Sequence, residues 1–245
     1  MRKLPGPILR RACRETARAL LDLCVPQTCA SCGGPTREPL CAACRSRLER
    51  RDGPRCRRCG EALLHADSAC VADHAWLRWI WFLCAPWRYR GAGGAVVRRF
   101  KFEGDPAAGG LLVEVMANAL SDFVRGAGRR ALVVHVPMHR RRRRARGFDQ
   151  AERLASGVAD RLGLEFGSGV LRRRRETLTQ TDPRVTSRQT NVEGAFDLRR
   201  PRIVRGRMVV LVDDVVTSGA TARACAAVLR ANGARRVVLL TATVG

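Results

Sequence analysis

The C-terminal half of the chain switches between unbroken apolar runs and runs in which apolar residues recur at helical spacing. The unbroken runs predict buried strands at 131–137, 208–212 and 236–244. The periodic runs predict amphipathic helices at 148–162 and 221–232, the second closed by Gly233, and a short strand is expected around Phe196. This alternation indicates an α/β fold with an open, mostly parallel sheet covered by helices.

The first 26 residues are basic and only partly apolar. Arginines and Glu15 interrupt the apolar positions, whereas a signal peptide needs an unbroken apolar run of about 7–15 residues. We expect an amphipathic helix, either packed on the body of the protein or lying on a membrane surface. The apolar stretch at 75–87 is shorter than the ~20 residues that span a bilayer. The sequence therefore predicts no transmembrane segment and a cytoplasmic protein, in which disulfides are rare.

Seven of the 11 cysteines lie between positions 29 and 70. The first four form two Cys-x-x-Cys pairs, and each such turn can direct two thiolates at one ion. Gly33 and Gly60 follow two of the pairs, where the turn needs a residue that tolerates positive φ. We predict one structural zinc site with four ligands: Cys29, Cys32, Cys41 and Cys44.

A second cysteine group repeats the spacing of the first with one departure. Its members are Cys56, Cys59 and Cys70, and Asp73 stands at the fourth position. Zinc accepts carboxylate and imidazole ligands, so Asp73, His74 or His65 could complete a second site. The alternative is a decayed site whose thiols bind no metal. The other four cysteines fit no metal-binding pattern and are expected to be ordinary buried thiols: Cys13, Cys24, Cys84 and Cys225.

A candidate ligand site follows the expected strand at 208–212. The strand runs into Asp213 and Asp214, and a hydroxyl-rich glycine loop then leads into a helix. The segment reads Asp213, Asp214, Val215, Val216, Thr217, Ser218, Gly219, Ala220, Thr221. Such a loop and helix N-terminus offer backbone N–H groups to a phosphate, and paired acids can bind two vicinal hydroxyls or attract a cation. The pattern predicts a sugar-phosphate site rather than a Walker A loop, because Gly-Lys-Ser/Thr is absent; the alternative is a chance turn of a nucleotide fold.

This segment resembles the phosphoribosyl pyrophosphate (PRPP) motif of type I phosphoribosyltransferases, with Ser218 in place of the second threonine. The resemblance implies the type I phosphoribosyltransferase fold and PRPP bound together with Mg²⁺. It also implies that Asp213 and Asp214 hold the ribose hydroxyls and that residues 217–221 bind the 5-phosphate.

Further stretches narrow the resemblance: Phe100-Lys101-Phe102-Glu103-Gly104-Asp105, Arg146-Gly147-Phe148-Asp149-Gln150, Thr179-Gln180, Arg188, Asn191 and Gly194-Ala195-Phe196. Together with the cysteine pairs, they resemble the ComF family, which is linked to natural competence. The resemblance implies a pyrophosphate loop containing Val136, Pro137, Met138, His139 and Arg146. It also implies a mobile loop at 172–195 with Gln180, Arg188 and Asn191. Asp149 and Asp73 depart from the family pattern, which has asparagine and often cysteine at these positions.

These inferences divide the chain into three parts. We expect an N-terminal amphipathic helix at 1–26, a zinc-ribbon-like module at 27–75 and a phosphoribosyltransferase-like domain at 76–245.

The charge adds a polyanionic partner to this interpretation. The chain has 46 Lys and Arg against 22 Asp and Glu, a net charge of +24, and only Lys3 and Lys101 are lysines. Such a charge favours phosphate, nucleotide or nucleic-acid partners, although a GC-rich coding sequence also enriches arginine. The arginines at 140–144 and 172–175 are expected in loops that bind pyrophosphate or single-stranded DNA, or are simply solvated. The four tryptophans are expected to stack on bases or to pack in the core.

Two functions follow from these observations. The first is an enzyme that transfers the phosphoribosyl group of Mg-PRPP to an acceptor and releases pyrophosphate. The second is a non-catalytic accessory protein of DNA uptake that binds single-stranded DNA or a helicase partner.

Overall fold

The computed structural model describes residues 28–56, 58–127, 131–175, 192 and 194–245. The expected N-terminal helix lies outside the described residues, as do the mobile-loop candidates Gln180, Arg188 and Asn191.

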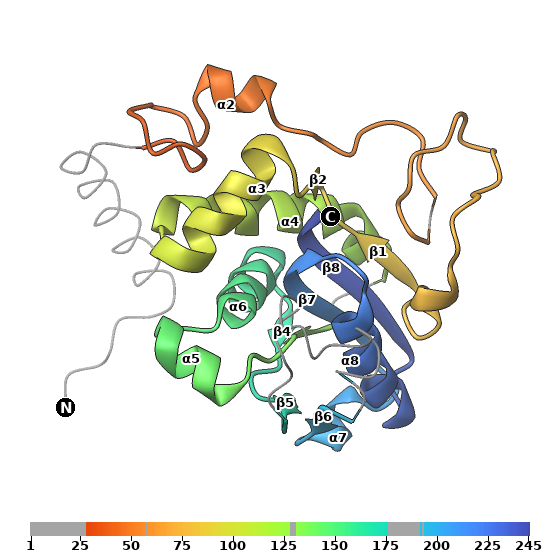
Figure 1. The fold of residues 1–245 in the computed structure, drawn as a ribbon. Helices are drawn as coiled ribbons and strands as arrows, with labels where there is room; N and C mark the ends of the chain where they lie inside the picture. Colours follow the sequence, from red (N-terminus) through yellow and green to blue (C-terminus); the bar gives the residue numbers. More distant parts are fainter. Residues whose placement is uncertain (1–27, 57, 128–130, 176–191, 193) are drawn as a thin grey trace, which may run out of the picture.

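A parallel sheet forms the centre of the fold (Figure 1). Its strands run in the order β1 (Phe82–Cys84), β8 (Arg236–Val244), β7 (Met208–Val216), β3 (Leu132–His135) and β4 (Glu165–Phe166), and β2 (Trp87–Arg88) also pairs with β8. Every pair in this sheet is parallel, which confirms the predicted architecture. The strand expected around Phe196 is β6 (Phe196–Leu198), which pairs antiparallel with β5 (Leu171–Arg173) in a separate two-stranded sheet.

The two predicted helices are present as α6 (Gln150–Leu162) and α8 (Ala220–Ala231). The remaining helical elements are α2 (Ala42–Ser46), η1 (Ala75–Leu77), α3 (Gly91–Arg98), η2 (Arg99–Glu103), α4 (Pro106–Ala127), α5 (Arg140–Arg146) and α7 (Pro201–Val204).

Both arginine runs were expected in loops; this expectation was wrong for Arg140–Arg144 and for Arg172 and Arg173, whereas Arg174 and Arg175 lie outside any strand or helix. Arg140–Arg146 forms α5, since arginine is a good helix former, with His139 at its N-cap and Gly147 (φ 82°) at its C-cap. Arg172 and Arg173 belong to β5, where Arg172 pairs with Asp197 of β6. Arg174 pairs with the same carboxylate at 2.6 Å, so part of the second run holds the β5–β6 pair together.

Each face of the sheet carries its own core. Val133, Val210 and Val238 point to the face covered by α3, α4 and α6, whereas Leu132, Leu211 and Leu239 point to the face covered by α8. Alternate residues of a strand face opposite sides, so unbroken apolar strands are required when both faces are covered.

Helix α4, which the sequence analysis did not predict, is unusually apolar. Residues Pro106–Val124 are long and apolar enough to cross a membrane by length and composition alone. In the fold, Leu112, Met116 and Leu120 of this helix are fully buried, and the helix contacts α6 and β8. Its apolar character is therefore used in covering the sheet.

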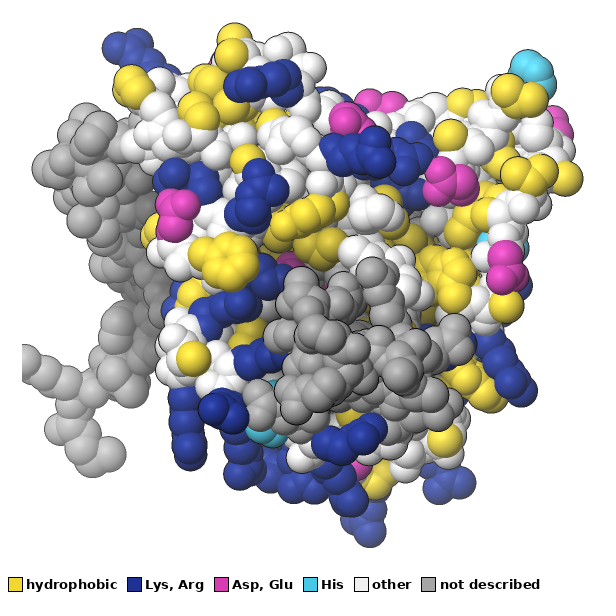
Figure 2. All heavy atoms as spheres, viewed as in Figure 1, with side chains coloured by type: hydrophobic (Ala, Val, Ile, Leu, Met, Phe, Trp, Pro, Cys, Tyr) yellow, Lys and Arg dark blue, Asp and Glu magenta, His cyan; other side chains and the backbone are white. Residues whose placement is uncertain are grey.

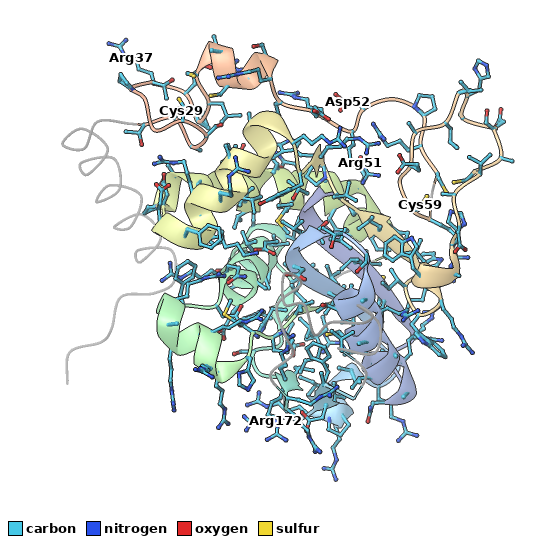
Figure 3. The ribbon with its side chains drawn as sticks, viewed as in Figure 1. Cys29, Arg37, Arg51, Asp52, Cys59 and Arg172 are labelled. Carbon is cyan, nitrogen blue, oxygen red and sulfur yellow. The ribbon has the colours of Figure 1, made fainter. Side chains whose placement is uncertain are left out.

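The two cysteine groups pack on opposite faces of the sheet. Cys29 and Cys44 join the core on the side of α3, whereas Cys59 joins the core on the side of α8. Figure 3 shows Cys29 and Cys59 on opposite sides of the molecule with Arg51 between them. The buried Arg51 guanidinium donates to the carbonyl oxygen atoms of Ala85 (3.2 Å) and Cys59 (3.4 Å).

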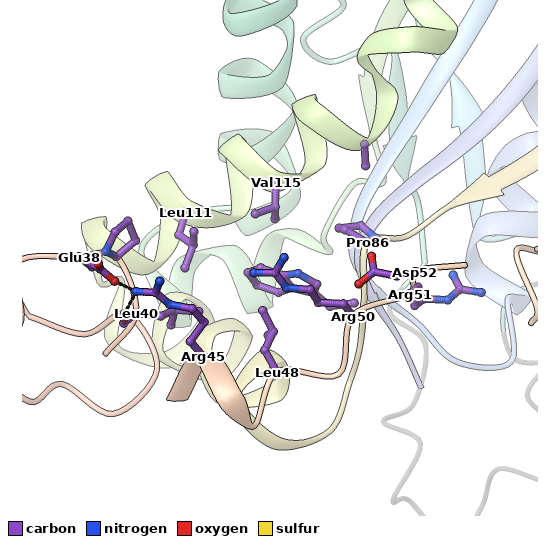
Figure 4. A pocket seen from close by; sticks show the side chains of 13 residues that line it. Glu38, Leu40, Arg45, Leu48, Arg50, Arg51, Asp52, Pro86, Leu111 and Val115 are labelled. Carbon is purple, nitrogen blue, oxygen red and sulfur yellow. Dashed lines mark hydrogen bonds and ion pairs between the residues drawn. The ribbon is translucent and has the colours of Figure 1, made fainter. Parts of the chain in front are cut away.

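A pocket of about 550 Å³ lies between residues of the 38–52 segment and α4 (Figure 4). Leu111 and Val115 of α4 form one wall, and Leu48 and Arg50 lie opposite. Asp213 and Asp214 do not line this pocket.

Candidate functional site

The paired acids lie within the carboxyl-terminal part of β7, which extends to Val216 and is longer than expected. The Asp214 side chain is 5% exposed, and its Oδ2 lies 2.9 Å from Nζ of Lys101. Asp214 Oδ1 accepts a hydrogen bond from the backbone N–H of Val215 at 2.8 Å, and Asp213 Oδ1 accepts one from the N–H of Asp214 at 2.9 Å. Both carboxylates are thus held by their own strand, and Asp214 also by a half-buried lysine.

Lys101 was missed as a site residue in the sequence analysis. It belongs to η2, the π-helical turn that continues α3, and π turns are frequent at functional sites. Burial opposes the charged form of Lys101, but the Asp214 carboxylate raises the pKa of the ammonium group above its ordinary value. Burial and the neighbouring Asp214 charge raise the pKa of Asp213 well above its ordinary value, and Lys101 opposes that rise. Two features of the sequence could have identified Lys101 as a site residue: it is one of only two lysines, and it lies in the segment 100–105.

The glycine loop connects β7 to α8. Gly219 is the N-cap residue of α8 and has a φ of +69°, a conformation that side chains disfavour. A Cβ built on Gly219 would lie 2.3 Å from Cε3 of Trp76, so the indole ring covers this residue. Thr217 and Ser218 remain exposed. The loop therefore presents hydroxyl groups to solvent on one side and is backed by Trp76 on the other.

The pyrophosphate-loop candidates begin next to the acids, because β3 is the neighbour of β7. The Val136 N–H donates to the Val212 carbonyl at 2.9 Å, and Val136 and Pro137 are buried. The Met138 N–H donates to Asp149 Oδ2 at 2.9 Å. Asp149 Oδ1 also accepts from the Glu152 N–H, capping α6, so aspartate fills this position with both oxygens in use.

Arg146, the last residue of this segment, lies close to Phe102 of η2. Arg146 Nη1 donates to Gln150 Oε1 at 2.8 Å, and its guanidinium lies 5.3 Å from the ring centroid of Phe102. Phe102 is 69% exposed. The positive charge of Arg146 lowers the pKa of Lys101 and so opposes the effect of Asp214. The Lys101–Asp214 pair and the end of α5 therefore share one electrostatic environment.

The first cysteine group has the geometry of a metal site. The Sγ atoms of Cys29, Cys32, Cys41 and Cys44 all lie within 4.8 Å of one another. The Gly33 N–H donates to the Cys29 carbonyl at 2.8 Å, and Gly33 has a φ of +75°, as the turn requires. Four thiolates in this arrangement fit a structural zinc ion with no open position.

The second group is completed by His74. Its Nε2 lies 3.5 Å from Sγ of Cys56 and 3.3 Å from Sγ of Cys59, and Cys70 belongs to the same group. Asp73, placed fourth in the sequence analysis, is not in the group; its Oδ1 accepts a hydrogen bond from the Ala75 N–H at 2.7 Å. A carboxylate that caps the next turn points away from the thiols, whereas the adjacent imidazole reaches them.

The remaining cysteines of the described residues are Cys84 and Cys225. Cys225 is fully buried, and the Cys84 thiol donates to the Ala119 carbonyl at 3.4 Å. No cysteine within the described part of the chain forms a disulfide.

Comparisons with known families match the two parts of this fold. A double zinc ribbon domain matches residues 20–72, and a phosphoribosyl transferase domain matches residues 149–243. The class of protein is thus a phosphoribosyltransferase-like α/β domain preceded by a double zinc ribbon.

Curated relatives define the family more narrowly. The chain is 30% identical over 224 residues to the DNA utilization protein YhgH of Escherichia coli K12, which covers 88% of this chain and 96% of the relative. It is 24% identical over 205 residues to Competence protein F of Haemophilus influenzae, covering 81% and 87%. The chain belongs to the ComF family. Among solved structures, the allosteric regulatory enzyme of purine biosynthesis matches at 21% identity over 59% of this chain and 30% of that chain, and its TM-score of 0.39 adds nothing to the assignment.

Proposed function

We propose that this protein binds Mg-PRPP at the carboxyl-terminal end of β7. The observation that carries this proposal is the buried Asp214, paired with Lys101 at 2.9 Å, directly before a glycine loop that opens α8. In this proposal Asp213 and Asp214 accept hydrogen bonds from the two ribose hydroxyls. The backbone N–H groups and hydroxyls of residues 217–221 bind the 5-phosphate.

The proposed reaction is transfer of the phosphoribosyl group to an acceptor. The bond between C1 of the ribose and pyrophosphate breaks as the acceptor forms a bond to C1, so positive charge develops on the sugar and negative charge on the leaving group. The protein contributes positioning and electrostatics: the acids lie beside the sugar, and the segment from Val136 to Arg146 meets pyrophosphate. Mg²⁺, bound with PRPP, supplies neutralisation of the pyrophosphate charge.

Replacing both acids with their amides is expected to weaken Mg-PRPP binding at least tenfold. Asp213→Asn with Asp214→Asn keeps the side-chain volume but removes the charged acceptors for the ribose hydroxyls, and hydrogen bonds to charged groups contribute about 1.5–3 kcal/mol each. Isothermal titration calorimetry would measure the dissociation constant. A charge-matched control is Asp67→Asn with Asp160→Asn, both exposed. Equal affinity in the acid-pair variant and the natural chain, or no binding by the natural chain, contradicts the proposal.

A second candidate function, binding of single-stranded DNA, is favoured by a groove at the opposite end of the sheet. This groove, of about 770 Å³, lies at the amino-terminal ends of β7 and β8, and its lining includes Trp81, Phe123, Arg205, Arg207, Arg235 and Arg236. Trp81 is 40% exposed, and the Arg236 guanidinium lies 3.8 Å from its ring centroid. Arginines for phosphates beside an aromatic ring for bases are the features of single-strand sites. Two relatives are named for DNA utilization and competence.

Helix α5, which carries the first arginine run, is an alternative surface for binding DNA. Figure 2 shows Lys and Arg side chains gathered along the lower edge of the molecule, over α5 and the β5–β6 pair. At α5 the exposed aromatic residue is Phe102, which lies beside Arg146 alone, whereas the groove places Trp81 among four arginines. The groove also has only one acidic lining residue, Asp122.

Neutralising the groove is expected to weaken binding of an oligo-dT strand more than neutralising α5. Arg205→Gln with Arg235→Gln should lower the slope of log affinity against log salt by about 1.4, at about 0.7 per phosphate contact on a single strand. Trp81→Ala should weaken binding about tenfold through lost stacking. The matched variant, Arg140→Gln with Arg144→Gln, removes the same charge from α5. Fluorescence polarisation across a salt series measures all three, and equal losses in the two arginine variants would remove the groove from consideration.

A further inference from the structure

The second cysteine group and the phosphate loop are joined by one short turn. His74 is followed at once by η1 (Ala75–Leu77), which carries Trp76. The Leu77 N–H donates to the His74 carbonyl at 2.9 Å, and Asp73 Oδ1 accepts from the Ala75 N–H at 2.7 Å. A single residue, Ala75, therefore separates a metal-ligand candidate from Trp76, whose indole ring covers Gly219.

The contact between Trp76 and the loop is close. A Cβ on Gly219 would lie 2.3 Å from Cε3 and 2.7 Å from Cζ3 of the indole, so the ring lies directly against the N-cap backbone of α8. Ala220 and Ala222 of α8 belong to the same buried cluster as Cys59 and Leu77, and Trp76 packs against this cluster. A shift of η1 would therefore leave the first turn of α8 without its cover.

The segment between Cys56 and Cys59 also holds η1 in place by a hydrogen bond. Arg58, which lies between Cys56 and Cys59, donates from Nη2 to the Leu77 carbonyl at 3.3 Å. The Arg58 carbonyl accepts from the N–H of Leu83, the middle residue of β1, at 2.7 Å. The thiols, η1 and the edge of the sheet are thus connected by hydrogen bonds as well as by packing.

We propose that metal bound by Cys56, Cys59, Cys70 and His74 holds Trp76 against Gly219 and thereby organises the phosphate loop. Trp76 acts as a positioning residue: it touches the backbone of the loop rather than the ligand. The three thiols and one imidazole within 4.8 Å fit zinc, and ligation of His74 fixes the first residue of the turn. Because linkage is reciprocal, a sugar phosphate that orders the loop also favours retention of this metal. The identity of the ligand in this inference rests on the proposed PRPP function. The connection from the metal through Trp76 to the loop does not depend on that function.

The test separates the metal from the indole ring. Zinc content, amide hydrogen exchange of residues 217–221 and Mg-PRPP affinity are measured for the full zinc-loaded chain and four variants: His74→Ala, His74→Cys, Trp76→Ala and Trp79→Ala. We expect His74→Ala to lose one zinc equivalent, to speed exchange of the loop at least threefold and to weaken affinity about fivefold. His74→Cys restores a thiolate ligand and should restore all three properties. Trp76→Ala should keep both zinc equivalents while showing the same loop exchange and affinity as His74→Ala. Trp79→Ala is the matched control, because its ring is 38% exposed and is stacked by Arg78.

Each outcome decides the proposal. Loop exchange in Trp76→Ala equal to that of the natural chain would overturn it, as would loss of zinc in His74→Ala without any change in the loop. If the natural chain binds no Mg-PRPP, the proposed function fails, and the exchange measurement alone still decides the connection. If Mg-PRPP binds but Trp76→Ala changes neither affinity nor exchange, the proposed function stands and this inference does not.

Discussion

Replacing Cys29 and Cys44 with serine is expected to lower the melting temperature by at least 10 °C. Both side chains are buried in the main core, at 0% and 2% exposure, beside residues of α3. Structural zinc sites in small fingers contribute about 10–16 kcal/mol to folding, which is comparable with the whole stability of a domain, about 5–15 kcal/mol. At about 2–4 °C per kcal/mol for a domain of this size, even a part of that contribution gives such a shift.

Differential scanning calorimetry with zinc analysis measures this effect. The control is Cys84→Ser, which changes a thiol that donates to the Ala119 carbonyl and belongs to neither cysteine group. We expect the control to keep its zinc and to lose only a few degrees, since a serine hydroxyl can make the same hydrogen bond. A Cys29/Cys44 variant that loses zinc yet melts with the natural chain would show that the first site is not part of the folded core.

Gly219→Ala is expected to destabilise the protein by about 2–5 kcal/mol. The left-handed backbone at φ +69° disfavours any side chain by about 1–2 kcal/mol. The added methyl group would also meet the indole of Trp76 at 2.3 Å, and forcing such a contact costs about 1–3 kcal/mol. Urea unfolding of the variant measures the sum of the two effects.

A double-mutant cycle separates the two contributions. In a Trp76→Ala background the steric part disappears, so Gly219→Ala should then cost only the backbone strain, and the coupling between the two positions should be about 1–3 kcal/mol. Gly110→Ala on α4 is the control, because a Cβ there meets nothing within 4 Å. Since Gly110 lies in a helix, the control should be stabilising by about 0.5–1 kcal/mol. A cost of Gly219→Ala that is the same in both backgrounds would mean that Trp76 does not restrain the loop.

The sequence predicted those parts of the fold in which local pattern determines structure. Strands β3, β7 and β8 are unbroken apolar runs because both faces of the sheet are covered, and α6 has a clear apolar stripe. Helix α5 was missed because a run of arginines has no apolar periodicity. Helix α3 was missed because Gly91, Gly93 and Gly94 weaken its helix propensity. Helix α5 depends on its caps, His139 and Gly147, whereas α3 depends on packing of residues such as Val96 and Val97.

The candidate site shows the same division. The acid pair and the glycine loop are contiguous, so they could be found by spacing alone. Lys101 reaches Asp214 from a segment more than a hundred positions away, and only the fold brings the two together. The choice between Asp73 and His74 depends on the direction in which the chain turns after Cys70, and a spacing rule does not contain that direction.

The place of β8 in the sheet also sets when the sheet can be completed during synthesis. Residues 236–244 form the strand between β1 and β7, so both neighbours lack a partner on that side until the ribosome has released this segment. The first cysteine group, close to the start of the chain, is synthesised well before the core that it covers. A nascent chain therefore carries metal-binding thiols early, and β1 and later β7 each keep an unpaired edge until β8 follows. Such edges favour aggregation.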